Sequence, residues 1–323
     1  MKALVCRKNT DDLADLRFEN IDLPPPGPNE VRVRIRAASV NFPDLLMAQG
    51  KYQHRPDLPF IVGGEFAGEV IATGRDAARF RPGDRVIGGG FSGAFAEERQ
   101  LLETALRPIP GAADFATAAS FTTGYLTAYV ALVRRGRLQP AEWLLVHGAS
   151  GGMGLAAVDL GRVLGATVIA TASTEEKRNF LKAYGADHVL PSAGFRDGVK
   201  ELTGGRGADV IYDPVGGDVF DESVRAIGFD GRLLVVGFTS GRIPTVPANM
   251  PLIKGFSVVG VRAGEYGRKF PEKGRENIAA IDRLLADGKL RPHIGARLPL
   301  DGAIEAMRLL ADRKAIGKVV IEP

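Results

Sequence analysis

The sequence predicts an α/β protein of two domains, in which a doubly wound parallel sheet is inserted into a mostly antiparallel β domain. Three observations support this prediction. The chain has 323 residues, which is more than one ordinary core accommodates. Short strands and turns dominate residues 1–118, whereas β and α patterns alternate over residues 119–261. The tail, residues 262–323, ends in an apolar strand that we expect to return to the first domain.

The first domain shows the period-two pattern of antiparallel strands. Residues 31–36 alternate valine or isoleucine with arginine, as in a strand with one face exposed. Residues 24–28 before it contain four prolines, which exclude regular structure. Residues 69–74 and 84–88 are two further expected strands that end in glycine. We therefore expect a barrel-like β region.

The second domain alternates helices with apolar strands. Residues 143–146 form a continuous apolar run, which is typical of a strand buried on both faces of a parallel sheet. Gly185 is the expected stop of a helix over residues 174–184. The other expected helices cover 118–132, 154–164, 276–286 and 302–311, and the other expected strands cover 166–170, 189–190, 210–212, 233–236, 257–261 and 318–321.

The composition excludes several classes of protein. The net charge is only +4, and no block of lysine and arginine suggests a nucleic-acid partner. Cys6 is the only cysteine, so neither an intrachain disulfide nor a cysteine-rich zinc site is expected. The N-terminus lacks the apolar stretch of a signal peptide, and no run reaches the roughly 20 apolar residues of a membrane span. We expect a cytoplasmic protein with no membrane partner.

The strongest local signal is the glycine-rich turn at residues 146–154, between an apolar strand and a helix. Such a turn lets the backbone approach a pyrophosphate, and the helix N-terminus then faces the phosphates with free N–H groups. Ala149 occupies the position of the usual first glycine. The alternative is a purely structural turn. The expected dinucleotide-binding residues are Ala149, Ser150, Gly151, Gly152, Met153 and Gly154.

The end of the second strand favours NADPH over NADH. An NAD-binding site places an acid about 20 residues after the turn, but Ser173 stands there, 19 residues after Gly154. Lys177 and Arg178 follow and suit a 2′-phosphate, which an acid would repel. Glu175 and Glu176 are counter-evidence, although acids are also favoured in the first turn of a helix.

With these features the chain resembles the zinc-free quinone oxidoreductases of the medium-chain dehydrogenase/reductase superfamily, over nearly its whole length. This resemblance implies a GroES-like catalytic domain over residues 1–118 and 262–323 and a Rossmann domain over residues 119–261. The motifs that carry it are residues 39–44, 59–70, 93–97, 149–154, 213–217 and 237–241.

The departures from the zinc-dependent members concern the metal ligands. Gly64, in Gly63-Gly64-Glu65, stands where those enzymes have a zinc-binding histidine, and Asn41 stands where they have a catalytic cysteine. Zinc needs about three protein ligands, so we expect no metal. Hydride addition to an already electrophilic acceptor, such as a quinone or an enone, is then the expected chemistry. The histidines share no ligand spacing: His54, His147, His188 and His293.

The resemblance also assigns individual residues. Asn41, Asp44 and Tyr52 would line the catalytic pocket and orient the acceptor carbonyl. Alternatively, Asn41 and Asp44 form a turn or helix cap, and Tyr52 packs a loop. Thr127 matches a threonine near the nicotinamide, or is an ordinary helix-interior residue. Some relatives hold the 2′-phosphate with a tyrosine after the next strand. Here that stretch reads Val189-Leu190-Pro191-Ser192, so the contact is either missing or shifted to Ser192. The remaining expected cofactor-binding residues are Val215, Gly237, Phe238 and Lys318.

The resemblance therefore predicts an NADPH:quinone oxidoreductase whose partner is a small quinone or enone. Two alternatives stay open, namely a reductase of activated alkenes such as enones or enoyl thioesters, and a non-catalytic NADPH-binding sensor. Family members often dimerise through an edge strand of the Rossmann sheet, so we expect a homodimer or a dimer of dimers. Residues 256–261 are the candidate edge strand.

Overall fold

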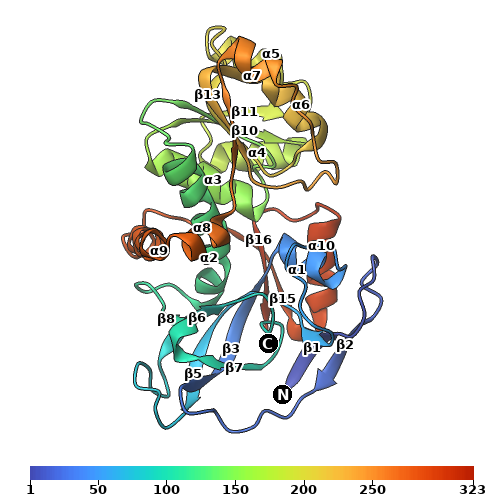
Figure 1. Cartoon of the computed structure of the whole chain (residues 1–323), viewed down its shortest axis with the longest axis vertical. Helices are drawn as coiled ribbons and strands as arrows, with labels where there is room; N and C mark the ends of the chain where they lie inside the picture. The colour runs from blue at the N-terminus through green and yellow to red at the C-terminus, as the bar shows by residue number, and fades with distance from the viewer. The chain divides into compact units, whose positions relative to one another are not determined.

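The computed structural model describes residues 1–323 and divides into two compact units (Figure 1). The first comprises residues 1–122 and 292–323, and the second comprises residues 123–291. The sequence analysis placed residues 262–291 in the first domain. In the structure the Arg134 side chain donates hydrogen bonds to Glu276 and Asn277, which ties this segment to the second unit.

The first unit is built mainly from β-strands. A larger sheet has the strand order β15-β16-β3-β5-β6-β8, with β7 also paired to β3, and a smaller sheet has the order β2-β1-β4. Its elements are β1 (Lys2–Cys6), β2 (Leu16–Asn20), β3 (Glu30–Val40), α1 (Phe42–Ala48), β4 (Phe60–Ile61), β5 (Glu65–Thr73), β6 (Arg85–Gly89), β7 (Glu98–Leu102), η1 (Glu103–Ala105), β8 (Leu106–Pro108), β15 (Ile294–Pro299), η3 (Leu300–Gly302), α10 (Ala303–Ala311) and β16 (Lys318–Glu322).

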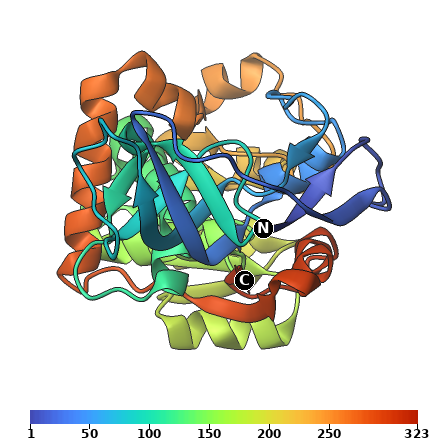
Figure 2. The ribbon, with the colours of Figure 1, turned by 90° about the horizontal axis from the view of Figure 1, so that it is seen from below.

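The tail returns to the first unit, as the sequence predicted. β16 pairs antiparallel with β3, so that Val319 lies opposite Val40 and Ile321 lies opposite Ala38. β3 pairs on its other side with β5. The end of β3, the start of β5 and the start of β16 therefore lie next to one another, although they are far apart in the sequence. Figure 2 shows the two chain termini in this unit.

The second unit contains a six-stranded parallel sheet with the order β11-β10-β9-β12-β13-β14. This is the doubly wound order of a Rossmann sheet, and the direction of winding reverses between β9 and β12. α2 (Phe115–Tyr129) begins in the first unit, enters the second at residue 123 and leads into the π-helical η2 (Val130–Arg135). The other elements are β9 (Trp143–Val146), α3 (Gly152–Val163), β10 (Thr167–Ala172), α4 (Glu175–Tyr184), β11 (His188–Pro191), α5 (Phe195–Leu202), β12 (Ala208–Asp213), α6 (Gly217–Ala226), β13 (Ile227–Val235), α7 (Asn249–Lys254), β14 (Ser257–Gly260), α8 (Ala263–Lys269) and α9 (Pro271–Ala286).

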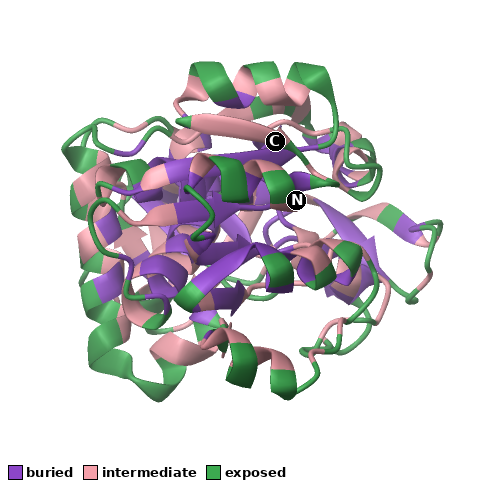
Figure 3. Cartoon of the chain, turned by 90° about the horizontal axis from the view of Figure 1, so that it is seen from above, coloured by how far each residue is buried: buried purple, intermediate pink, exposed green.

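The predicted fold class is confirmed, and its strongly patterned elements form as expected. Burial follows the predicted pattern, because buried residues concentrate in the strands while much of the helix surface is exposed (Figure 3). Gly185 ends α4 with φ = 116°, a conformation that favours glycine. Helices α1, α5, α6, α7 and α8 are short and were not predicted. None of the helices combines the length and the apolar character that a membrane span requires.

Candidate active site

Asn41 and Asp44 form the start of α1, directly after β3. The Asn41 N–H donates to Asp44 Oδ2 at 2.8 Å, and the Asp44 N–H donates to the Asn41 carbonyl at 3.0 Å. This reciprocal arrangement is a helix cap. The capping interpretation of the two residues is therefore realised in the structure, and it fixes where their side chains lie.

The side chain of Asn41 joins a buried polar cluster. Its Nδ2 donates to Glu65 Oε2 at 3.1 Å and to the Ser39 carbonyl at 3.2 Å. Its Oδ1 accepts a hydrogen bond from Lys318 Nζ at 2.6 Å, and Lys318 Nζ is 3.7 Å from Glu65 Oε2. The neighbouring positions of β16, β3 and β5 bring these residues together. We call Asn41, Asp44, Glu65 and Lys318 the Asn41 cluster.

The Asn41 cluster holds three ionisable groups away from water. Asp44, Glu65 and Lys318 are exposed by only 1%, 3% and 7%. Burial raises the pKa of Asp44 to about 7, against the opposing effects of the Asn41 N–H and the Lys318 ammonium. Burial also lowers the pKa of Lys318. When Asp44 is protonated, one carboxylate and one ammonium remain and their charges balance.

The backbone around Gly64 leaves no room for a side chain. A Cβ at Gly64 would lie 2.8 Å from the Gly90 carbonyl oxygen and 3.5 Å from Asp44 Oδ1. A histidine at this position would therefore require the loop that contains Gly90 to move. No group of three or more histidine, cysteine, aspartate or glutamate side chains is arranged to hold a metal ion.

Tyr52 lies apart from these polar contacts. It is half-buried and packs against the core of the first unit, so the loop-packing interpretation describes its position. Nearby in the chain, the His54 ring stacks on Phe91 with the ring centroids 3.8 Å apart. The structure thus brings Asn41 and Asp44 together with Glu65 and Lys318, and it shows no contact between Tyr52 and this cluster.

The glycine-rich turn has the geometry that a bound dinucleotide requires. Gly148 has φ = +55°, and a Cβ at Gly154 would lie 2.3 Å from the Gly148 carbonyl oxygen. Gly151 precedes α3 without a side-chain cap, so the N–H groups of the first helical turn have no partner within the helix. Ala149 is fully buried, and its N–H donates to the Thr171 carbonyl. The residues present therefore fit a pyrophosphate.

His147, just before this turn, holds three elements together. Its Nδ1 lies 3.0 Å from Thr171 Oγ1 on β10, and its Nε2 lies 2.8 Å from Ser223 Oγ on α6. Ser223 donates its hydroxyl proton to the Val219 carbonyl, so His147 Nε2 must be the donor to Ser223. Burial lowers the pKa of His147 to about 3, so the ring is neutral. Sequence reasoning classed it only as an unremarkable histidine.

Residues expected at the 2′-phosphate lie at one edge of the parallel sheet. Ala172 and Pro191, the last residues of β10 and β11, are register partners, and Ser173 and Ser192 follow them. Lys177 lies in the first turn of α4, where its N–H donates to Thr174 Oγ1. The Arg178 guanidinium donates to the carbonyls of Ala172 and Ser173, at 3.3 and 3.4 Å, which places a second cation at this strand end.

The loops after β12 and β13 are joined beside the glycine-rich turn. Asp213 Oδ1 accepts hydrogen bonds from the N–H groups of Val215 and Gly216, at 2.7 and 2.9 Å. A Cβ at Gly148 would touch the Val215 side chain at 3.2 Å, and one at Gly216 would meet the Phe238 ring at 2.8 Å. Val215, Gly237 and Phe238 are thus held near the point where the sheet reverses its winding.

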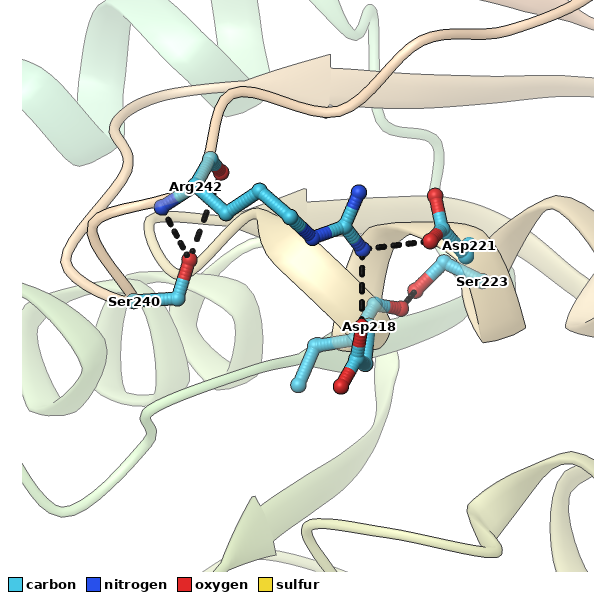
Figure 4. Close-up of polar contacts among 6 residues, drawn as sticks. Asp218, Asp221, Ser223, Ser240 and Arg242 are labelled. Atoms are coloured by element: carbon cyan, nitrogen blue, oxygen red, sulfur yellow. Dashed lines mark hydrogen bonds and ion pairs between the residues drawn. The ribbon is translucent and has the colours of Figure 1, made fainter.

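Arg242 fastens the second of these loops to α6 (Figure 4). Its guanidinium donates to Asp218 Oδ1 at 2.8 Å and also to Asp221, and its backbone N–H donates to Ser240 Oγ. Sequence analysis did not identify this contact, since an exposed arginine in a polar loop carries no local signal.

Two further expected cofactor-binding residues, Thr127 and Lys318, lie outside the parallel sheet. Thr127 is half-buried in α2, one turn after Gly124, whose Cβ position is 3.5 Å from the Gly152 carbonyl oxygen. This places α2 beside the glycine-rich turn. Lys318 lies in the first unit, where its ammonium bonds to Asn41 and not to any residue at the strand ends of the parallel sheet.

Comparison with known proteins gives two family matches and close relatives. Residues 27–135 match the alcohol dehydrogenase GroES-like domain, and residues 152–281 match the zinc-binding dehydrogenase family. A quinone oxidoreductase-like protein 2 homolog of Nematostella vectensis is 42% identical over 300 residues, which are 91% of this chain and 82% of that protein. A mycocerosic acid synthase-like polyketide synthase of Mycobacterium tuberculosis is 30% identical over 96% of this chain, which corresponds to 15% of that protein.

Solved structures with the same fold cover the whole chain. A probable oxidoreductase from Mycobacterium abscessus is 37% identical and covers 100% of this chain and 99% of its own, with a TM-score of 0.89. A quinone oxidoreductase from Escherichia coli, complexed with NADPH, is 28% identical and covers 100% of both chains, with a TM-score of 0.90.

Proposed function

The chain is an oxidoreductase that belongs to the quinone oxidoreductase subgroup of the medium-chain dehydrogenase/reductase superfamily, and we propose that it reduces a quinone or similar electron-poor carbonyl compound with NADPH and without zinc. The observation that carries this proposal is the backbone at Gly64. The position of the superfamily's zinc-binding histidine has no space for a side chain, and a buried cluster of carboxylates and an ammonium lies beside it.

The preference for NADPH is supported by the end of β10. Ser173 and Ser192 close two neighbouring strands, and Lys177 and Arg178 follow in α4 without an acid at the strand end itself. A 2′-phosphate carries negative charge that these cations attract. The Escherichia coli relative binds NADPH with the same fold, which supports the same choice.

When bound, NADPH supplies a hydride from its nicotinamide ring. The residues of this chain would then have to stabilise the negative charge that develops on the acceptor oxygen. Both N–H groups of the Asn41 amide are already used by Ser39 and Glu65, whereas Lys318 has three N–H groups and only two acceptors near it. We therefore assign oxyanion stabilisation to Lys318, with Asn41 and Glu65 holding its ammonium in place.

A second candidate function is reduction of activated alkenes, such as enoyl thioesters. The observation that favours it is the likeness to a mycocerosic acid synthase-like polyketide synthase, a segment of which is 30% identical to this chain. Both functions use the same hydride donor, so the acceptor separates them.

A steady-state screen tests the proposed function. NADPH oxidation would be followed with quinones, enones and acyl-CoA thioesters, each with and without a metal chelator. We expect turnover of quinones that the chelator leaves unchanged. Turnover of thioesters alone would replace the leading proposal with the alkene reductase, and complete loss of activity with the chelator would contradict zinc independence.

We further propose that two chains associate through β14, the edge strand of the parallel sheet. Val258 on this strand is 38% exposed, and Leu252 and Ile253 on the preceding α7 are 82% and 72% exposed. β14 pairs with β13 on one side only, and an open strand edge with exposed apolar side chains favours pairing with a second copy. Analytical ultracentrifugation is expected to show a dimer that Val258→Asp weakens, whereas a monomeric wild type would contradict the proposal.

A further inference from the structure

The first unit contains an arginine, Arg99, one of whose guanidinium nitrogens has no hydrogen-bond acceptor in the chain. Arg99 lies on β7, and its Nη1 is buried with no hydrogen-bond partner. Burial lowers the pKa of Arg99 to about 10, and no neighbouring acid opposes this shift. A buried donor without an acceptor costs stability, and an anion that accepted from Nη1 would remove that cost.

An aromatic ring and two glycines surround the Arg99 guanidinium. The guanidinium lies over the Phe66 ring, 5.2 Å from its centroid. On the loop after β6, a Cβ at Gly90 would lie 2.9 Å from Arg99 Nη2, and a Cβ at Gly93 would lie 2.9 Å from Arg99 Nε. Any other residue at these two positions would press against the guanidinium, so the glycines allow the loop to pass closely over it.

The same loop borders the Asn41 cluster. The Gly90 N–H donates to the Gly64 carbonyl at 2.8 Å, and the Cβ position of Gly64 is 3.5 Å from Asp44 Oδ1. Gly90 and Phe91 are exposed, and Phe91 carries the ring that stacks on His54. The loop of residues 89–93 therefore lies between the Arg99 guanidinium and the Asn41 cluster, where we place the acceptor.

We propose that Arg99 and the Gly90–Gly93 loop form a subsite for an anionic group, a carboxylate, sulfonate or phosphate, carried by the acceptor molecule. This inference rests on the proposed function and narrows its substrate class from electron-poor carbonyl compounds to those that also bear an anion. The planar guanidinium matches the oxygens of such groups, and a charge-assisted bond in a poorly hydrated position contributes more than one in water.

Two quinones that differ by one charge test the subsite: 1,4-naphthoquinone and 1,4-naphthoquinone-2-sulfonate. In Arg99→Gln we expect kcat/KM for the sulfonate to fall by about tenfold or more, mainly through KM, since a charged hydrogen bond is lost. The neutral quinone should change less than twofold. Each ratio compares one acceptor in two proteins, so the different reactivities of the quinones cancel. Arg99→Lys should retain part of the preference, because it keeps the charge.

Two controls separate binding from structure. Arg34→Gln makes the same replacement at an exposed position of the neighbouring β3 and should affect neither acceptor. The melting temperature of Arg99→Gln should equal or exceed that of the wild type, because a buried unpaired charge has been removed. Equal losses for both quinones together with a lower melting temperature would assign Arg99 a structural role and overturn the proposal.

Two further measurements separate the subsite from the cofactor site and from the proposed function. If Arg99→Gln weakens NADPH binding as strongly as it weakens the sulfonate, the anion is a cofactor phosphate and the acceptor subsite is wrong. If the wild type reduces neither quinone, the proposed function fails, and calorimetric binding of naphthalene-2-sulfonate tests the subsite by itself. Arg99-dependent binding would support the subsite, and binding equal in wild type and Arg99→Gln would overturn it.

Discussion

The two candidate sites of this protein are built in different ways. In the second unit the site consists of backbone N–H groups and glycines that follow consecutive strands, and its central turn is one short stretch of chain. In the first unit the site consists of side chains from distant parts of the sequence, and the Lys318–Asn41 hydrogen bond joins residues that are 277 positions apart. A dinucleotide site can thus be encoded locally, whereas the Asn41 cluster depends on the order of three strands.

The two sites also differ in charge. The glycine-rich turn contains neutral groups that act through their position, but the Asn41 cluster contains three ionisable groups that are almost completely buried. Substitutions that remove a single charge should therefore lower the free energy of unfolding most when they are made in the Asn41 cluster of the first unit. In the second unit the sensitive change should be the addition of a Cβ to the turn, and charge changes near it should affect ligand choice and not folding.

The largest effect is expected for Lys318→Met. It leaves the Glu65 carboxylate buried without its ammonium partner, which typically destabilises a protein by about 3–5 kcal/mol. Urea unfolding followed by far-UV circular dichroism measures this loss. Lys314→Met, at an exposed lysine four residues earlier, is the matched control and should change the free energy of unfolding by less than about 0.5 kcal/mol.

A double variant sharpens this test. Lys318→Met combined with Glu65→Gln removes both charges of the pair, so a large part of the lost stability should return. If the double variant is as unstable as the sum of the two single variants, the cluster is not a coupled charge pair and the proposed electrostatic difference between the units does not hold.

The next effect concerns the glycine-rich turn. In Gly154→Ala the added Cβ would lie 2.3 Å from the Gly148 carbonyl oxygen and 2.5 Å from Ala149 Cα, so the turn must shift. We expect the Kd for NADPH to rise about a hundredfold, measured by fluorescence titration. Gly264→Ala in α8 is the control, because its nearest neighbour atom is the end of the Arg268 side chain at 3.6 Å. Unchanged affinity in Gly154→Ala would mean that the turn does not hold the pyrophosphate.

The same contrast explains what could be predicted from the sequence. The parallel sheet, its glycine-rich turn and the Gly185 helix stop have local patterns, and the structure contains all three. The pairing of β16 with β3 was expected only in outline, from the apolar end of the tail. Glu65 is part of the Gly63-Gly64-Glu65 motif, but the sequence analysis gave it no role. Its hydrogen bond with Asn41 follows from the strand register, which a single sequence does not encode locally.

Other features had no usable sequence signal. Lys318 was expected among the cofactor-binding residues, and the antiparallel return of β16 buries its ammonium beside Asn41 in the first unit. His147 became informative only once its neighbours Thr171 and Ser223 were known, because they come from different elements. Burial and long-range pairing determine these roles, and both are properties of the folded chain.

A smaller effect follows from the raised pKa of Asp44. Its pKa of about 7 in the folded protein exceeds the usual carboxyl range, so folding favours the protonated form. The corresponding stability is present at low pH and is lost as the pH rises through about 7. Asp44→Asn cannot ionise. Between pH 5 and 8 the wild type should therefore lose roughly 2.5 kcal/mol relative to Asp44→Asn, measured by urea unfolding. A constant difference would show that Asp44 does not titrate in this range.

The smallest effect concerns a charge change at the dinucleotide site of the second unit, which should alter cofactor affinity and leave the free energy of unfolding unchanged. Lys177→Glu places an acid in the first turn of α4, beside Ser173 at the end of β10. The 2′-phosphate is then repelled, so the Kd for NADPH should rise about tenfold or more while the Kd for NADH stays the same. Lys182→Glu, in the last turn of the same helix, makes an equal charge change away from the strand end and should alter neither Kd. Equal losses of NADPH and NADH in Lys177→Glu would remove Lys177 from the phosphate site, and Arg178, which is bonded to the carbonyls of Ala172 and Ser173, would then be the cation that selects the cofactor.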